Sequence, residues 1–228
     1  MTRGGHIATG TSAQRRAKTA VNGTAKSVST RQTIIAAARS VFVDIGYFDA
    51  RVADIVAAAD VSQGSFYTYF PSKREVFEEV VNEVGAMIRK AVVHTDADVP
   101  GQIVHNLENA NRRYLRVHYA NARLLALVDQ VSTGDPELKR FRIAGRRYHV
   151  ERVERTITNL QERGLADPGI DPHTSAGALV SMLSNFAHWS SILSEEYEEE
   201  AVVKTVTAIW VKAIGLHAAT KDAGESLT

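Results

Sequence analysis

Apolar residues recur along most of this chain at the three- and four-residue steps of a helix with one buried face. Val52, Ile55, Val56 and Ala59 form one such stripe, and longer stripes follow further along. No segment shows the apolar–polar alternation that a half-buried strand requires. The pattern therefore predicts an all-α protein of about nine helices.

The segment from Val52 to Phe77 combines two short helices, a tight turn and the start of a third helix. Asp60 stands where the chain must reverse, and aspartate is one of the few residues that tolerate a left-handed backbone conformation. Ser62 can cap the second helix through its hydroxyl, and Pro71 ends that helix. Two short helices joined in this way are typical of a helix-turn-helix, whose second helix enters the major groove of DNA.

The second of these helices has one apolar face and one hydrogen-bonding face. Phe66 and Phe70 are four residues apart, so both are expected to point inward. The other side offers an amide, two phenols and two hydroxyls, which suit base edges and phosphate oxygens. The candidate DNA-binding residues from this pattern are Gln63, Ser65, Tyr67, Thr68 and Tyr69.

A run of specific residue types in fixed register surrounds this helix. The preceding helix ends in VFVDIGY (41–47), and DIVAAADVSQGSFYTYFPSK (54–73) follows. On these residues the chain resembles, from Thr30 to Val81, the TetR family of bacterial transcriptional regulators. The motif positions that match are Val61, Ser62, Gly64, Ser65, Tyr67, Tyr69, Phe70, Ser72 and Lys73. The resemblance adds Gly64 to the candidate DNA-binding residues, together with Lys73 as a phosphate contact.

Two positions depart from the family motif. Ala50 and Arg51 replace a common threonine or serine, which removes a hydroxyl cap and a phosphate contact. Asp49 is the candidate replacement for the cap, and Arg51 the candidate replacement for the phosphate contact. Asp60 stands where the family prefers glycine.

The resemblance and the helical pattern together imply a domain organisation. We expect a helix-turn-helix DNA-binding domain over residues 29–75 and a larger helical ligand-binding and dimerisation domain over residues 76–218. Residues 1–28 have almost no large apolar side chains, so they are expected to be a disordered basic tail, with a second disordered tail at 219–228.

The last two predicted helices carry apolar seams, and the resembled family uses the corresponding helices for a four-helix dimer interface. The candidate interface residues are Leu179, Leu183, Phe186, Val202, Val206, Ile209 and Ala213. Packing within one monomer would give the same seams. Further apolar residues off the seam, such as Met182 and Trp189, favour a second apolar face and thus a homodimer.

The resembled family also binds a small inducer in a pocket among its fourth to eighth helices. The candidate lining residues are Met87, Tyr114, His118, Phe141, Tyr148 and Trp189, and a plain core role is the alternative for each. Arg112, Arg113 or Arg142 nearby would suit an apolar acid.

Composition limits the remaining chemistry. The chain has no cysteine, which excludes disulfides and thiolate metal sites. Its histidines show no metal-ligand spacing, so neither a metal nor another cofactor is expected. No apolar run approaches the roughly 20 residues that span a bilayer, and the N-terminus lacks a signal-peptide core, so we expect a cytoplasmic protein without membrane partners.

Charge is distributed unevenly although the net charge is only +1. No acidic residue precedes Asp44, whereas seven arginines and lysines do. This basic segment either keeps the protein soluble or neutralises DNA phosphates, and the sequence favours neither role.

These observations favour a homodimeric, sequence-specific repressor that leaves a palindromic double-stranded DNA operator when a small, largely apolar effector binds. A constitutive DNA-binding regulator without an inducer is the alternative. An enzyme on a helical scaffold is disfavoured, because no catalytic constellation is found in the sequence.

Overall fold

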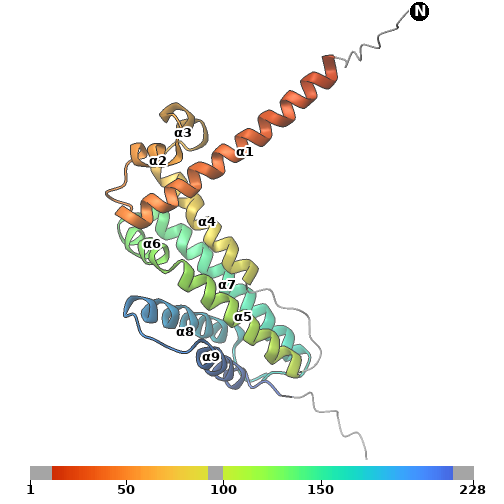
Figure 1. The fold of residues 1–228 in the computed structure, drawn as a ribbon. Coiled ribbons are helices and arrows are strands. Elements are labelled where there is room, and N and C mark those ends of the chain that lie inside the picture. Colours follow the sequence, from red (N-terminus) through yellow and green to blue (C-terminus); the bar gives the residue numbers. More distant parts are fainter. Residues whose placement is uncertain (1–11, 92–99, 218–228) are drawn as a thin grey trace, which may run out of the picture. The chain divides into compact units, whose positions relative to one another are not determined.

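The computed structural model describes residues 12–91 and 100–217, and over these residues its regular elements are nine helices and no strands (Figure 1). The all-α prediction is therefore confirmed. The helices are α1 (Ser12–Ile45), α2 (Val52–Ala59), α3 (Gln63–Tyr69), α4 (Lys73–Ala91), α5 (Pro100–Ala120), α6 (Ala122–Gly134), α7 (Pro136–Glu162), α8 (Pro172–Ile192) and α9 (Glu199–Ala213). The chain divides into two compact units, and the boundary between them lies inside α4, between Val80 and Val81.

The first unit is built on the apolar face of α1. Ile34, Ala38 and Phe42 on that face are fully buried. The ring of Phe42 meets the ring of Phe77, at the start of α4, edge to face at 5.1 Å between centroids. Burial of such aromatic pairs supplies much of the stability of a small helical domain. Ile55 of α2 is also fully buried, so the predicted α2 stripe faces the core.

Helix α1 begins earlier than the sequence suggested. The expected disordered tail extended to residue 28, but α1 starts at Ser12; residues 1–11 and 218–228 lie outside the described part of the chain. The stretch from residue 12 to residue 28 is rich in alanine, lysine and arginine, which have high helix propensity. Low hydrophobicity indicated that this stretch would not join a core, and it did not predict the local helix.

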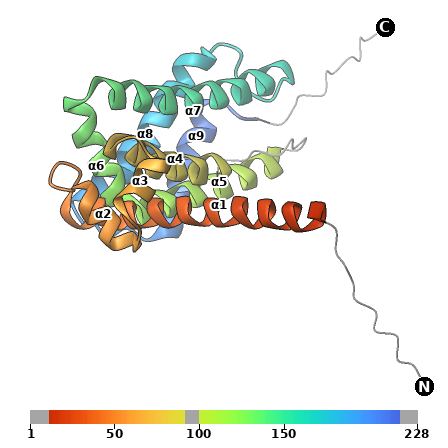
Figure 2. The same cartoon turned by 90° about the horizontal axis from the view of Figure 1, so that it is seen from above.

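The second unit consists of packed helices around one apolar cluster. Helix α7 packs against α8, and α5 packs against α9 (Figures 1 and 2). Leu115, Ile157 and Val203 are buried at the centre of this cluster. No helix among the described residues is both long and apolar enough to span a membrane.

Two helices of this unit, α7 and α8, begin with an aspartate cap followed by a proline. Asp135 Oδ1 accepts hydrogen bonds from the backbone N–H groups of Glu137 at 2.9 Å and Leu138 at 3.1 Å. Asp171 Oδ1 accepts one from Thr174 N–H at 2.7 Å. Each cap satisfies backbone donors that a helix start leaves without partners.

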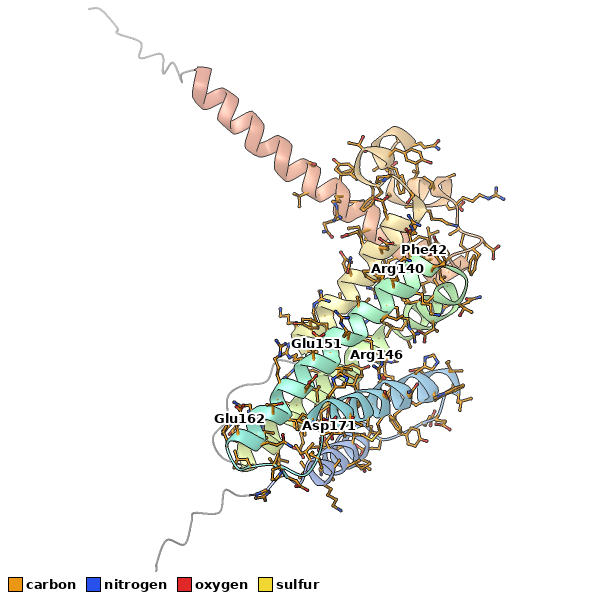
Figure 3. The ribbon with its side chains drawn as sticks, turned by 180° about the vertical axis from the view of Figure 1, so that it is seen from behind. Phe42, Arg140, Arg146, Glu151, Glu162 and Asp171 are labelled. Carbon is orange, nitrogen blue, oxygen red and sulfur yellow. The ribbon has the colours of Figure 1, made fainter. Side chains whose placement is uncertain are left out.

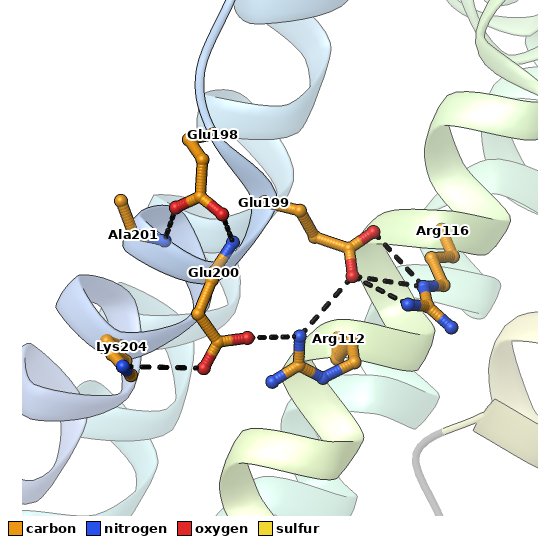
Figure 4. A network of polar contacts seen from close by, with 7 residues as sticks. All are labelled: Arg112, Arg116, Glu198, Glu199, Glu200, Ala201 and Lys204. Atoms are coloured by element: carbon orange, nitrogen blue, oxygen red, sulfur yellow. Dashed lines mark hydrogen bonds and ion pairs between the residues drawn. The ribbon is translucent and has the colours of Figure 1, made fainter.

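An arginine–glutamate network joins α5 to the start of α9 (Figure 4). Arg116 Nη2 lies 2.7 Å from Glu199 Oε1, and Arg112 Nη1 lies 2.7 Å from Glu200 Oε2. Hydrogen bonding to Arg112 lowers the pKa of Glu200. The acidic run near residue 200 thus fixes α9 on α5, and Arg112 is engaged outside the cavity described below.

Candidate functional site

Helix α3 presents a polar face to solvent and an apolar face to the core. Phe66 is 0% and Phe70 2% exposed, as their spacing predicted. Gln63, Tyr67 and Thr68 are exposed, the Tyr67 side chain to 49%. Ser65 and Tyr69 are half-buried at the edges of this face. The exposed phenol of Tyr67 and amide of Gln63 can therefore form hydrogen bonds with a partner outside the chain.

The turn before α3 has the predicted backbone conformation. Asp60 adopts φ 51° and ψ 48°, in the left-handed region, so aspartate serves where the family prefers glycine. Ser62 Oγ accepts a hydrogen bond from Ser65 N–H at 3.1 Å and caps α3. Both predictions at this turn are confirmed.

Gly64 has no crowding within the chain that would require a glycine. A Cβ atom added there would meet only Ser62 Oγ, at the ordinary contact distance of 3.9 Å. The exposed backbone of Gly64 on α3 therefore allows close approach by a partner from outside.

The start of α2 is capped differently from the prediction. Asp49 was the candidate cap, but Asp54 Oδ2 accepts the hydrogen bond from Arg51 N–H at 2.8 Å. A carboxylate at the third helical position reaching back to the cap residue is one half of a capping box. The side chain of Arg51 remains exposed, as a phosphate contact requires.

Lys73 is held inside the first unit. Its Nζ donates to the carbonyl oxygens of Tyr47 and Ala50, each at 2.7 Å, and lies 4.6 Å from the centroid of the Tyr47 ring. Burial lowers the pKa of Lys73, and the nearby charge of Asp49 partly offsets this effect. The predicted phosphate contact does not fit this geometry. Lys73 instead fixes the loop between α1 and α2.

The second unit contains a cavity of about 940 Å³ among α4 to α8, with Trp210 of α9 also on its wall. Tyr114, His118, Phe141 and Trp189 line it, as the sequence suggested. Met87 and Tyr148 are absent from the lining and are 44% and 41% exposed. Both residues lie on outer faces of their helices, α4 and α7. A cavity of this size is in the range of small-molecule sites.

Several polar groups of the cavity wall are neutral near pH 7. Burial, with a smaller effect of His188, lowers the pKa of His118 to about 4. Burial raises the pKa of Tyr114 to about 12. His118 Nδ1 and Trp210 Nε1 are buried without a hydrogen-bond partner among the described residues. Unpartnered buried polar atoms are costly, so a bound molecule or water that pairs with them would be favoured.

Sequence reasoning missed several ionisable residues of the wall. Arg89, Arg146, His149 and Arg152 line the cavity, whereas Arg113 donates from Nε to the carbonyl of Ala91 at 2.7 Å. Arg146 projects from α7 towards α8 and donates to Ser181 Oγ at 2.7 Å (Figure 3). Arg142, Arg146, His149 and Val153 are three or four residues apart and therefore share one helix face. This spacing could have identified the cavity-facing side of the helix from the sequence.

The structure separates the seven candidate dimer residues into two groups. Leu179, Leu183, Val202 and Val206 are buried in the core of their own chain. Phe186 is half-buried, whereas Ile209 and Ala213 are exposed. The monomer core thus uses most of the seam. The large apolar side chains that α8, α9 and their connection leave exposed are Trp189, Ile192, Leu193, Tyr197 and Ile209.

Comparison with known proteins places the first unit among bacterial regulators. A family model described as "Bacterial regulatory proteins, tetR family" matches residues 34–80. The HTH-type transcriptional repressor DhaR of Mycobacterium sp. is 37% identical over 81 residues, which cover 35% of this chain and 40% of that protein. The A-factor receptor protein of Streptomyces griseus is 27% identical over 166 residues, covering 69% and 53%. The chain matches between about two fifths and half of the length of these relatives.

Solved structures resemble a larger part of the chain. A putative TetR-family transcriptional regulator from Mesorhizobium loti superposes with a TM-score of 0.66 at 21% identity, covering 83% of this chain and 96% of that one. The fatty acid degradation regulator FadR from Bacillus halodurans gives 0.64 at 22% identity, covering 82% and 97%. At these identities the likeness establishes the fold across both units.

Proposed function

The chain belongs to the TetR family of helix-turn-helix transcriptional regulators, and we propose that it is a homodimeric repressor released from a palindromic operator by a small, largely apolar ligand. The relatives found are transcriptional regulators and not enzymes. The observation that carries the DNA-binding part is the exposed polar face of α3, set on a buried pair of phenylalanines.

Contacts with DNA are assigned by position on this face. Gln63 at the start of α3 and Tyr67 one turn later are both exposed and are suited to base edges. Arg51 is exposed at the start of α2 and is suited to a phosphate. Ser65, Thr68 and Tyr69 flank these groups, and Gly64 lets the backbone approach closely. The basic tail of residues 1–28 would add affinity in any DNA sequence.

Ligand response is proposed because the second unit holds an open volume instead of a filled core. A constitutive regulator has no need of a cavity of about 940 Å³ with unpartnered ring nitrogens on its wall. Helix α4 supplies a possible link, since Lys73–Val80 belong to the DNA-binding unit while Asn82, Gly85 and Arg89 line the cavity. A ligand can shift the regulator only if it binds the two states with different affinity.

The ligand response is tested on the protein–DNA complex with a panel of small metabolites. We expect at least one compound to release DNA from the unmodified protein. Ser184 lines the cavity, so the Ser184→Leu variant should bind DNA normally and resist release, because its larger side chain takes up ligand space. If no compound releases DNA from the unmodified protein, the chain is the constitutive regulator.

A further inference from the structure

The cavity wall carries an excess of positive charge. Four arginines line it, on two different helices: Arg89 of α4, and Arg142, Arg146 and Arg152 of α7. Asp129 of α6 is the one carboxylate among its described lining residues. Of the three lining histidines, His118 and His149 have lowered pKa values and add no charge at pH 7.

The single carboxylate neutralises only one of these arginines. Asp129 Oδ1 lies 2.6 Å from Arg142 Nη2, and its other oxygen lies 3.6 Å from His188 Nδ1. Among the described residues, Arg89, Arg146 and Arg152 have no carboxylate within ion-pair distance. Arg146 is held by the neutral hydroxyl of Ser181.

Arg89 and Arg152 form a cluster with His149. Arg152 Nη1 lies 3.4 Å from the backbone oxygen of Arg89, and the Arg89 guanidinium lies 5.8 Å from the centroid of the Tyr148 ring. Burial, and then the charges of Arg89 and Arg152, lower the pKa of His149. Both guanidinium groups thus concentrate positive charge around one uncharged imidazole, and a bound anion would offset that charge.

The rest of the wall is largely apolar. Ile88, Leu107, Val128, Val153 and Leu183 contribute buried side chains from five helices. Such a surface favours hydrocarbon over water. The cavity therefore combines an apolar volume with a localised group of cations.

From this arrangement we infer that the effector is an organic anion, with an apolar body in the cavity and a carboxylate or phosphate headgroup at Arg89 and Arg152. The inference rests on the proposed ligand response and specifies its chemistry. A guanidinium matches either headgroup with two parallel N–H donors. A neutral effector would leave the arginine cluster unpaired, and a cationic effector would be repelled by it.

Four probes with the same ten-carbon chain separate the headgroup from the apolar body: decanoate, decyl phosphate, decanol and decylamine. Calorimetric titration of the full chain at pH 7 should show at least one anion binding ten or more times more tightly than decanol. Decylamine should bind most weakly. The stronger of the two anions identifies the headgroup.

Charge-removing variants locate the headgroup. Arg89→Gln and Arg152→Gln should each reduce the preference for the anion over decanol several-fold, with little effect on decanol itself. Arg147→Gln is the matched control, since Arg147 also lies on α7 but pairs with Glu151 at 3.1 Å and does not line the cavity. Circular dichroism establishes that each variant is folded.

Equal binding of decanol and the anions, preferential binding of decylamine, or no binding of any probe overturns the inference. An unchanged preference in both arginine variants does so as well. The proposed function fails separately, when no DNA is bound or when no compound of any charge releases it. If only neutral compounds release DNA, the proposal of a ligand-responsive regulator stands and the proposal of an anionic effector is wrong.

Discussion

Lys73 shows how a residue in a recognised motif acquires its role from three-dimensional contacts. Its ammonium group is bonded to two carbonyl oxygens of the α1–α2 loop and lies over the ring of Tyr47. Two of the three ammonium donors are used in this way, and Phe48 O lies 3.4 Å from the same nitrogen, so this lysine is directed into its own chain and away from a phosphate. Arg51 is exposed, and we propose that it takes the electrostatic role.

Lys73→Ala and Arg51→Ala should therefore affect different properties of the protein, stability and DNA binding. Lys73→Ala is expected to lower the free energy of unfolding by about 2 kcal/mol, because charged hydrogen bonds are lost. Arg51→Ala should leave stability unchanged but weaken DNA binding and flatten its salt dependence by roughly one unit of slope. Thermal melts and DNA titrations at several salt concentrations measure both effects. If the Lys73→Ala protein keeps its stability and its DNA binding shows a flattened salt dependence, Lys73 contacts a phosphate as the sequence predicted.

The lowered pKa of His118 predicts that the folded protein loses stability in acid. Its folded pKa of about 4 is below the ordinary value of 6.5, so the unfolded chain binds more protons between these values. The stability it contributes is complete above pH 6.5 and is lost as the pH falls towards 4. Between pH 7 and 5 the loss is about 2 kcal/mol.

Urea unfolding at pH 7 and pH 5 tests this expectation. His118→Asn should lose about 2 kcal/mol less stability than the unmodified protein over this interval. His105→Asn, an exposed histidine on the same helix, should behave as the unmodified protein does. Identical pH dependence in all three proteins would show that His118 is protonated normally.

Among the elements, helices with local start and stop signals could be predicted from the sequence. The aspartate–proline pairs at Asp135 and Asp171 mark the starts of α7 and α8, because capping depends on neighbours within three residues. The start of α1 could not be predicted from the apolar pattern, since the sequence from residue 12 to residue 28 carries no apolar stripe. The cap of α2 was assigned to Asp49 instead of Asp54, because several carboxylates were within reach.

One substitution in α3 is expected to raise stability and weaken DNA binding. Gly64→Ala should stabilise the helix by roughly half a kcal/mol, since glycine is a poor helix former. The same methyl group should weaken DNA binding, because it projects from the α3 backbone where DNA must approach. Gly177→Ala in α8, where an added Cβ would meet nothing within 4 Å, should stabilise without affecting DNA binding. Tight DNA binding by Gly64→Ala would remove close approach as the reason for the glycine.

At the scale of the whole molecule, the sequence indicated a cavity and an interface but assigned their residues only in part. The helix periodicities identify apolar faces, whereas the side of a helix that meets a cavity depends on how the other helices pack. Arg89 and Arg152 were missed for this reason. The seam on α8 and α9 was split in the same way between the monomer core and the surface.

The homodimer is tested at Ile209, which remains exposed on α9. Ile209→Glu would place an unpaired charge in the proposed interface and weaken the dimer by about 3 kcal/mol, roughly a hundredfold in dissociation constant. Met87→Glu is the matched control, because Met87 is equally exposed at 44% but lies on α4. Analytical ultracentrifugation over a dilution series should show monomer for Ile209→Glu alone. Dimerisation by both variants at unmodified strength would exclude Ile209 from the interface.

The proposal that α3 reads DNA as part of a symmetric dimer is tested most directly by selecting bound fragments from a random double-stranded DNA pool. The unmodified protein should enrich an inverted repeat whose half-sites are centred about one helical turn, roughly 34 Å, apart or a multiple of it. The Gln63→Ala, Tyr67→Ala double variant should be folded and lose this enrichment. No enriched sequence with the unmodified protein, or the same repeat with the double variant, would contradict DNA reading by the exposed face of α3.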